Sequence, residues 1–314
     1  MAKLLAVFGA TGHQGSSIIN FVLNNPSLSQ QYKIRAITRD GTSPKATRLT
    51  QQGVEVIQAD MNDPTSLTAS LSGVHTVFIM TVPNFKSEDP DDQLYTAKKI
   101  ADTAVQQGAE YIIFSTLPNY ATLSGGKYTK VFPFDAKAKA EEYIRTLPVK
   151  SAFYCPGIFM ENFQDQPYIG PKKRDDGTWA VARHYSPATE LPLIDATGDT
   201  GKFVGAMLAE PEKYEGKTVA AAQGVYTIAE AVEIISKATG KKVVYEQVSE
   251  EEFRKSLPFE GPYSDVFVEG FGFQEEYGYF GPGTRKSVAE ASSVPHGRLR
   301  TLEEFLETHP LILE

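Results

Sequence analysis

The sequence predicts a Rossmann-type α/β fold, in which a doubly wound parallel sheet is joined to a smaller C-terminal α/β lobe. Short apolar, β-branched segments alternate with helical patterns through the first half of the chain, an order typical of a parallel sheet. Several of these segments are apolar throughout, as expected when helices cover both faces of the sheet. The first segment runs directly into Gly9-x-x-Gly12-x-x-Gly15, which has the glycine spacing of a dinucleotide-binding turn.

The expected elements follow one another in a regular order. The strands span residues 4–10, 33–39, 54–60, 76–82, 111–116 and 151–157, with helices near residues 14–24, 44–52, 64–71, 91–107 and 134–147. Residues 165–195 are rich in Pro, Gly, Asp and Lys and show no sustained period. The pattern then predicts a helix near 199–209, strands at 218–222 and 243–248, and helices that begin after Thr227, Ser249 and Thr301. Each of these three residues is followed by Glu at capping-box spacing.

The change of pattern near residue 157 divides the chain into two parts. We expect residues 1–157 to form the nucleotide-binding domain and residues 158–314 to form a smaller lobe that contacts a substrate or partner. Whether strands of the lobe return to the main sheet stays open. Residues 259–283 are dense in Gly and aromatic side chains, and we interpret them as a surface that closes over a pocket or meets a partner.

The composition excludes several classes of protein. Of the 314 residues, 41% are hydrophobic and 22% are charged, which is typical of a globular chain, and no apolar run approaches the length of a membrane span. A net charge of −8 argues against direct binding to nucleic acid, so any regulatory role is expected to act through a protein partner. The single cysteine, Cys155, and five histidines without metal-ligand spacing predict no disulfide and no metal site. We expect a cytoplasmic protein, with the nucleus as the alternative compartment.

The glycine-rich turn is the predicted phosphate site. Glycines allow a tight turn and a close approach of the backbone to a pyrophosphate, which then lies at the N-terminus of the following helix. The predicted cofactor contacts in this turn are Gly9, Ala10, Thr11, Gly12, His13, Gln14 and Gly15.

The end of the second strand predicts NADP(H) as the cofactor. Arg39 stands at the strand tip, followed by Ser43, Lys45 and Arg48, and a guanidinium suits a 2′-phosphate. Asp40 offers the alternative of a carboxylate that holds the ribose of NAD. Further adenine and ribose contacts are expected after the third and fourth strands, at Asp60, Met61, Thr81, Val82, Pro83 and Asn84.

The chain resembles the NmrA-like family. The resemblance rests on Gly9-Ala-Thr-Gly-His-Gln-Gly15, Thr38-Arg39, Phe134-Asp-Ala-Lys137 and Pro156-Gly-Ile-Phe-Met-Glu-Asn162-Phe, and extends over nearly the whole sequence. The family consists of atypical short-chain dehydrogenases and includes NADP(H)-sensing redox sensors. It implies that Lys137 reaches the cofactor, that Ile158, Phe159 and Asn162 lie beside the nicotinamide, and that Arg39 holds the 2′-phosphate. Tyr95 and Ser43 stand where the redox sensors have basic residues.

The catalytic machinery of ordinary short-chain dehydrogenases is incomplete. Those enzymes use a Tyr-x-x-x-Lys pair after the fifth strand, but here Pro133 stands four residues before Lys137, while Ser115 keeps the position of the usual serine. The string Tyr95–Lys99 has the same spacing but falls on the preceding helix, and we interpret it as chance. Phe132, Phe134, Tyr154, Phe159 and Phe163 either line a cleft or belong to the core.

Two hypotheses about function stay open. The missing tyrosine favours a regulator that senses the NADP(H) redox state and acts through a protein partner, with transcription as one candidate process. The alternative is an NADPH-dependent reductase of a small carbonyl, enone or imine, with Lys137 as general acid or base. A closed apolar pocket beside Lys137 would favour the reductase. The sequence leaves a homodimer open.

Overall fold

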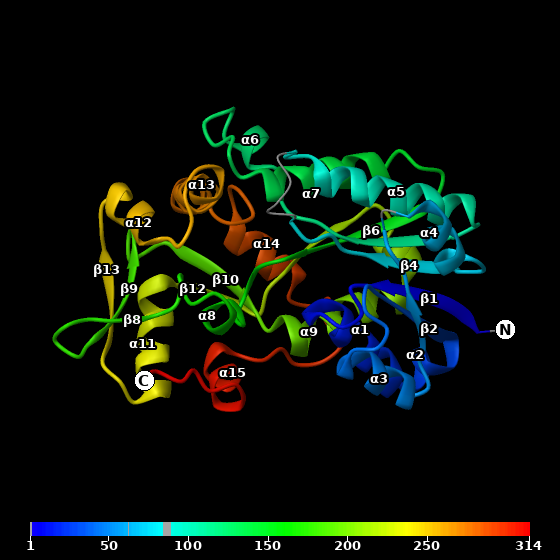
Figure 1. Cartoon of the computed structure of the whole chain (residues 1–314), viewed down its shortest axis with the longest axis horizontal. Coiled ribbons are helices and arrows are strands. Elements are labelled where there is room, and N and C mark those ends of the chain that lie inside the picture. Colours follow the sequence, from blue (N-terminus) through cyan, green and yellow to red (C-terminus); the bar gives the residue numbers. More distant parts are fainter. Residues whose placement is uncertain (1, 62, 84–88) are drawn as a thin grey trace.

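The computed structural model of the chain describes residues 2–61, 63–83 and 89–314, and a seven-stranded sheet forms its centre (Figure 1). All neighbouring strands in this sheet are parallel, in the order β11-β6-β5-β4-β1-β2-β3. The strands are β1 (Lys3–Phe8), β2 (Tyr32–Thr38), β3 (Glu55–Gln58), β4 (Thr76–Ile79), β5 (Tyr111–Ser115), β6 (Lys150–Pro156) and β11 (Thr218–Ala221). The strand order reverses between β1 and β4, so the carboxyl ends of these two strands form the switch point at which such folds bind ligands.

Helices cover both faces of the sheet (Figure 1). One face packs against α1 (His13–Asn24), α2 (Pro26–Gln31), α3 (Pro44–Gln51) and α9 (Ala196–Ala209), in a core that includes Leu5, Ile18 and Phe203. The other face packs against α4 (Pro64–Leu71), α5 (Asp92–Gln106) and α7 (Phe132–Ile144), in a core that includes Phe8 and Ile100. The two apolar faces explain why the central strands lack alternation.

Two glycines allow α9 to pack closely on α1. A Cβ at Gly201 would lie 2.4 Å from the carbonyl oxygen of Ser17, and a Cβ at Gly205 would lie 2.3 Å from the ring of Phe21. The backbone N–H of Gly201 also donates to Ser17 Oγ at 2.9 Å. Helix α9, from the second half of the chain, therefore packs against the nucleotide-binding half.

Most of the remaining elements form the lobe at the opposite end of the molecule from the N-terminus (Figure 1). One small sheet has the order β12-β10-β7 and the other the order β13-β9-β8. The strands are β7 (Ile158–Phe159), β8 (Lys172–Lys173), β9 (Trp179–Arg183), β10 (Glu190–Ile194), β12 (Gly224–Thr227) and β13 (Val243–Gln247). The other helices are α6 (Tyr120–Leu123), α8 (Asn162–Asp165), α10 (Pro211–Tyr214), α11 (Ile228–Thr239), α12 (Glu250–Ser256), α13 (Pro262–Tyr277), α14 (Thr284–Ala291) and α15 (Leu302–Thr308). Outside the lobe, α6 packs on α7, and α10 and α14 pack on the main sheet.

The predicted strands and longer helices are confirmed, with ends that differ by a few residues. All three capping boxes are present, at Thr227, Ser249 and Thr301. The unpatterned residues 165–195 contain β8, β9 and all of β10. They show no alternation because β9 pairs with β13 far along the chain and has no exposed residue. The aromatic segment 259–283 contains α13. In the described ranges, no helix has the length and apolar character needed to cross a membrane.

Candidate functional site

The glycine-rich turn lies at the switch point of the sheet. Gly9 follows β1 with a φ of +67°, and a Cβ there would lie 2.7 Å from Met80 Sδ, which follows β4. A Cβ at Gly15 would lie 2.3 Å from the carbonyl oxygen of Gly9. Gly12 begins α1 without a side-chain cap, so the first N–H groups of the helix keep no side-chain acceptor. The turn therefore fits a phosphate group held by backbone N–H groups.

Two charged residues, Arg39 and Asp40, follow β2 and differ in their contacts. Arg39 is exposed and makes no hydrogen bond or ion pair within the described residues. Asp40 is engaged in its own turn: its Oδ1 accepts hydrogen bonds from the N–H and Oγ1 of Thr42, at 2.9 and 2.7 Å. These bonds hold the pKa of Asp40 below its usual value. The arrangement leaves the guanidinium available for an anion and keeps one oxygen of the carboxylate occupied.

The other residues predicted near this end of the sheet differ in what their side chains contact. Ser43 caps α3, with its Oγ accepting from the N–H of Ala46 at 3.3 Å, so its hydroxyl serves the helix. Lys45 donates from Nζ to the carbonyl oxygen of Thr11 at 3.3 Å, which brings a cation to the glycine-rich turn. Asp60 is exposed after β3, whereas Met61 packs against the core beneath α4 and α5. Asn84 lies outside the described residues.

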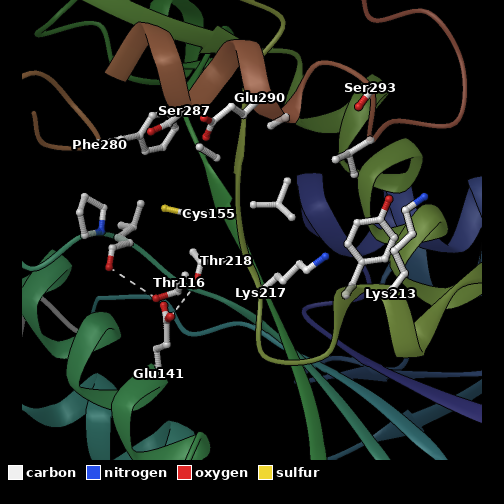
Figure 2. Close-up of a pocket in the computed structure, with 17 residues that line it drawn as sticks. Thr116, Glu141, Cys155, Lys213, Lys217, Thr218, Phe280, Ser287, Glu290 and Ser293 are labelled. Carbon is white, nitrogen blue, oxygen red and sulfur yellow. Dashed lines mark hydrogen bonds between the residues drawn. The ribbon is translucent and has the colours of Figure 1, made fainter. Parts of the chain in front are cut away.

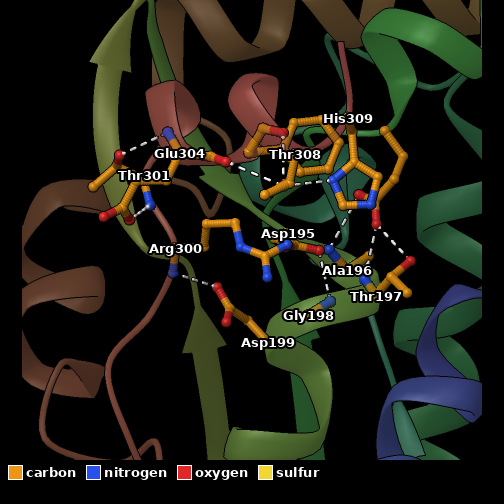
Figure 3. Close-up of polar contacts among 12 residues, drawn as sticks. Asp195, Ala196, Thr197, Gly198, Asp199, Arg300, Thr301, Glu304, Thr308 and His309 are labelled. Atoms are coloured by element: carbon orange, nitrogen blue, oxygen red, sulfur yellow. Dashed lines mark hydrogen bonds and ion pairs between the residues drawn. The ribbon is translucent and has the colours of Figure 1, made fainter.

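The side chain of His13 contacts residues outside the glycine-rich turn, whereas the sequence predicted a cofactor contact. Its Nδ1 lies 2.8 Å from Thr197 Oγ1, and its Nε2 lies 2.9 Å from Asp165 Oδ2. Thr197 lies in the first turn of α9, next to Asp195, which caps the helix and pairs with Arg300 at 2.6 Å (Figure 3). His13 thus joins the glycine-rich turn to the lobe, and only its backbone stays in the turn.

A mainly apolar cavity of about 460 Å³ continues from the switch point towards the lobe. Eight of the predicted site residues line it, namely Gln14, Thr81, Val82, Pro83, Lys137, Ile158, Phe159 and Asn162. Ser115, Pro133 and Phe134, which the sequence also singled out, line the cavity as well. Other lining residues were not predicted individually, and these include Met80, Leu117, Val131, Gln166, Ile169, Val266, Phe267, Gly270, Phe271, Gln274 and Tyr279. Five of these come from α13, so the aromatic segment does close over a pocket. Tyr154 and Phe163 belong to the core instead.

Lys137 is the one charged side chain among the described residues that line this cavity. It is 8% exposed, and its Nζ donates to the carbonyl oxygen of Thr81 at 2.6 Å and to Thr81 Oγ1 at 2.8 Å. Thr81 Oγ1 in turn donates to Gln93 Oε1 at 3.1 Å. A charged amine has three N–H bonds, so the third has no protein acceptor in the described part of the chain. Burial lowers the pKa of Lys137 to about 7.

The position expected for a catalytic tyrosine is part of the cavity wall. Pro133 lines the cavity in the first turn of α7, one helical turn before Lys137, and has no proton to give. Ser115 lines it from the carboxyl end of β5. The structure therefore places a buried amine beside the switch point without the usual phenol on the same helix.

A second cavity of about 560 Å³ lies along β11 (Figure 2), and Leu117 lines both cavities. Lys213 and Lys217 lie on one side of the second cavity and Cys155 on the other. Burial raises the pKa of the Cys155 thiol, so the sulfur stays protonated and unreactive. None of the predicted site residues lines this cavity, and no cluster of three or more metal-ligating side chains occurs among the described residues.

The whole chain has clear relatives. The model of the NmrA-like family matches residues 1–306. An NmrA-like family domain-containing protein of Dictyostelium discoideum is 29% identical, with 98% of both chains covered, and the NmrA-like family domain-containing oxidoreductase hkm9 of Aspergillus hancockii is 28% identical, with 98% and 97% covered.

Solved structures have the same fold. NmrA, described as a negative transcriptional regulator, has a TM-score of 0.80 in complex with NAD, at 25% identity over 97% of this chain and 94% of that one. Its complex with NADP gives 0.80 at 24% identity, over 99% and 98%. The triphenylmethane reductase of Citrobacter sp., complexed with NADP(H), gives 0.74 at 22% identity, over 97% and 99%.

Proposed function

The chain belongs to the NmrA-like family, and from this premise we propose that it is an NADP(H)-dependent reductase of an apolar carbonyl, enone or imine compound. The observation that carries the proposal is the cavity itself, which joins the glycine-rich turn to a buried lysine with one unused N–H. Pockets of this size and character are typical of small-molecule sites. The oxidoreductase names of the relatives support the same class.

The residues present fit a nicotinamide dinucleotide. Gly9 and Gly15 leave a turn that a Cβ would fill, and the uncapped start of α1 suits the pyrophosphate. Arg39 is available for a 2′-phosphate, and Ile158, Phe159 and Asn162 line the cavity where the family resemblance implies nicotinamide contacts. The cofactor, when bound, supplies the hydride. The complexes of NmrA with NADP and with NAD support this assignment.

Lys137 supplies the proton in this proposal. As a carbonyl carbon accepts hydride, its oxygen takes the third proton of the Lys137 ammonium, and the product is an alcohol with a neutral amine left behind. The two hydrogen bonds to Thr81 fix the remaining N–H bonds, so the transferred proton has one direction. Since the pKa of Lys137 is about 7, the amine regains a proton from water near neutral pH.

A redox-sensing regulator is the second candidate, and one observation favours it. Pro133 occupies the place of the usual proton donor, so the cavity lacks the pair found in ordinary short-chain dehydrogenases. The resemblance to NmrA, a negative transcriptional regulator, supports it as well. A regulator of this kind would act through a protein partner, in the cytoplasm or the nucleus, and would distinguish NADP from NADPH by a difference in affinity.

Turnover separates the two candidates. We would measure oxidation of NADPH with a panel of aldehydes, quinones, enones and imines, for the natural protein and for Lys137→Met. The reductase proposal expects turnover with at least one apolar member, reduced about 10²- to 10⁴-fold in the variant, as for loss of a positioned acid. No turnover across the panel, together with unequal affinities for NADP and NADPH, would overturn it in favour of the regulator.

A further inference from the structure

Tyr279 lines the cavity from a part of the chain far from Lys137 in sequence. It follows α13, it is 5% exposed, and it is one of the residues that line the same cavity as Lys137. Its hydroxyl makes no hydrogen bond with any described residue. A buried hydroxyl without a partner is costly, so a cavity that holds one is suited to a ligand that accepts a hydrogen bond from it.

The surroundings hold Tyr279 firmly against the helix that carries Lys137. Its ring lies edge-on to that of Phe134, with centroids 5.7 Å apart, and Phe134 precedes Lys137 by three residues on α7. Its carbonyl oxygen accepts a hydrogen bond from the buried Tyr120 hydroxyl at 3.0 Å. These contacts use the ring and the carbonyl oxygen of Tyr279 and do not involve its hydroxyl.

The charge of the residues that line the cavity indicates which kind of ligand group this hydroxyl can bind. The described lining residues include no carboxylate, and Lys137 contributes a positive charge when protonated. Burial raises the pKa of Tyr279 well above its usual value, so the phenol keeps its proton and acts as a donor rather than as an acid. Neutral donors in an enclosed site stabilise negative charge that develops on an oxygen atom.

We propose that the Tyr279 hydroxyl is the second hydrogen-bond donor to the substrate's reacting oxygen, so that the site selects substrates in which negative charge develops on oxygen. In this proposal Tyr279 supplies the hydroxyl that a tyrosine at position 133 on α7 would supply in an ordinary short-chain dehydrogenase. The phenol stays protonated throughout, and Lys137 alone exchanges a proton. The inference rests on the proposed function for the reaction, but the binding of an oxyanion can be tested without turnover.

The test compares two probes of nearly equal shape, 4-nitrophenolate and 4-nitroanisole, with the protein saturated with NADP. Tyr279→Phe removes the hydroxyl and keeps the ring and the carbonyl oxygen. We expect the dissociation constant of 4-nitrophenolate to rise about tenfold or more, as for loss of one hydrogen bond to a charged group, while that of 4-nitroanisole changes less than about twofold. Tyr154→Phe is the control, because that hydroxyl is buried against Thr200 outside the cavity.

Each other outcome has a defined meaning. Equal losses for both probes, unchanged binding of 4-nitrophenolate, or failure of the natural protein to bind it would overturn the inference. A loss for 4-nitrophenolate in Ser115→Ala but not in Tyr279→Phe would overturn it as well, since it would make Ser115 the donor. If the probes behave as expected but no substrate is reduced, the reductase proposal fails and the assignment of Tyr279 as an oxyanion donor stands.

Discussion

Nε2 of His13 lies 2.9 Å from Oδ2 of Asp165, and this contact ties the start of α1 to helix α8. The other ring nitrogen faces Thr197, at the start of α9. Asn162 lies on α8 and Gln166 follows it, and both line the cavity. The side chain next to the phosphate-binding turn therefore supports the wall of the cavity, and the cofactor turn and the cavity are mechanically connected through it.

His13→Ala should weaken the wall of the cavity more than the cofactor site. Because the turn binds phosphate through its backbone, we expect the dissociation constant of NADPH to change less than about threefold. Loss of two partly exposed hydrogen bonds should lower the free energy of unfolding by about 0.5–1.5 kcal/mol. Calorimetry and urea unfolding measure the two effects. A tenfold loss of NADPH affinity with unchanged stability would instead assign the imidazole to the cofactor.

Gly12 and Gly15 should fail in different ways when replaced by alanine. A Cβ on Gly15 would lie 2.3 Å from backbone, so Gly15→Ala should cost about 1–3 kcal/mol of stability through overpacking. A Cβ on Gly12 would lie 3.4 Å from the nearest atom, so Gly12→Ala should fold well but lose NADPH affinity, because the side chain stands where the backbone approaches phosphate. Thermal unfolding and calorimetry test the pair. Normal NADPH binding by a folded Gly12→Val protein would place the phosphates elsewhere.

Arg39 should determine the preference for NADP(H) over NAD(H). Its guanidinium has no partner among the described residues, whereas one carboxylate oxygen of Asp40 is held by Thr42. Arg39→Ala should raise the dissociation constant of NADPH about tenfold or more and leave that of NADH nearly unchanged. Asp40→Asn is the matched control, with little expected effect on either ratio. An Arg39→Ala protein that still prefers NADPH would contradict the assignment.

Gly201→Ala should destabilise the fold even though alanine favours helices. Alanine in an open helix position gains about 1 kcal/mol over glycine, but here the Cβ would lie 2.4 Å from the Ser17 carbonyl oxygen in α1. We expect a net loss of about 1–3 kcal/mol in the free energy of unfolding. Gly224→Ala is the control, because its Cβ would meet nothing closer than 3.6 Å. Equal stability of both variants would mean that α1 and α9 separate easily.

The sequence predicted the parts of the molecule that depend on local pattern. The six strands of the first half, the long helices and the glycine-rich turn each follow from neighbouring residues. The pairing of β9 with β13 joins segments about 60 residues apart and leaves no local period, so residues 165–195 carried no prediction. For the same reason α13 could be recognised as a covering surface but its individual cavity residues could not.

The site was predictable where backbone position decides the role and less so where side chains choose among partners. Lys137 and Asn162, which were predicted to contact the cofactor, both line the cavity, and helices α7 and α8 hold them there. The hydroxyl of Ser43 caps α3, and the imidazole of His13 contacts Thr197 in α9. The sequence pattern alone did not indicate either contact. Tyr279 lies in the aromatic segment 259–283, but nothing near it in sequence distinguishes its hydroxyl from those of the other tyrosines in that segment.

The pH dependence of Lys137 is the most direct test of its proposed role. Its pKa is about 7 in the folded protein, against a usual value of 10.5, because burial disfavours the charged form. As a proton donor it is active when protonated, so kcat/KM for reduction should be flat below about pH 7 and fall up to tenfold per pH unit above it. A lysine acting as a base, or not at all, would give a rise or no change.

Stability gives the same pKa an independent readout, with the opposite sign. Between about pH 7 and 10.5 the unfolded chain holds a proton on Lys137 that the folded chain has released, so the free energy of unfolding should rise with pH in this window. The slope is at most about 1.4 kcal/mol per pH unit from this one group. Below about pH 7 both states are protonated and the contribution is constant. Urea unfolding from about pH 6 to about pH 9 should show that Lys137→Met is more stable near neutral pH and loses this part of the slope. An unchanged slope in the variant would mean that the buried amine keeps an ordinary pKa, and the case for proton donation near neutral pH would fall with it.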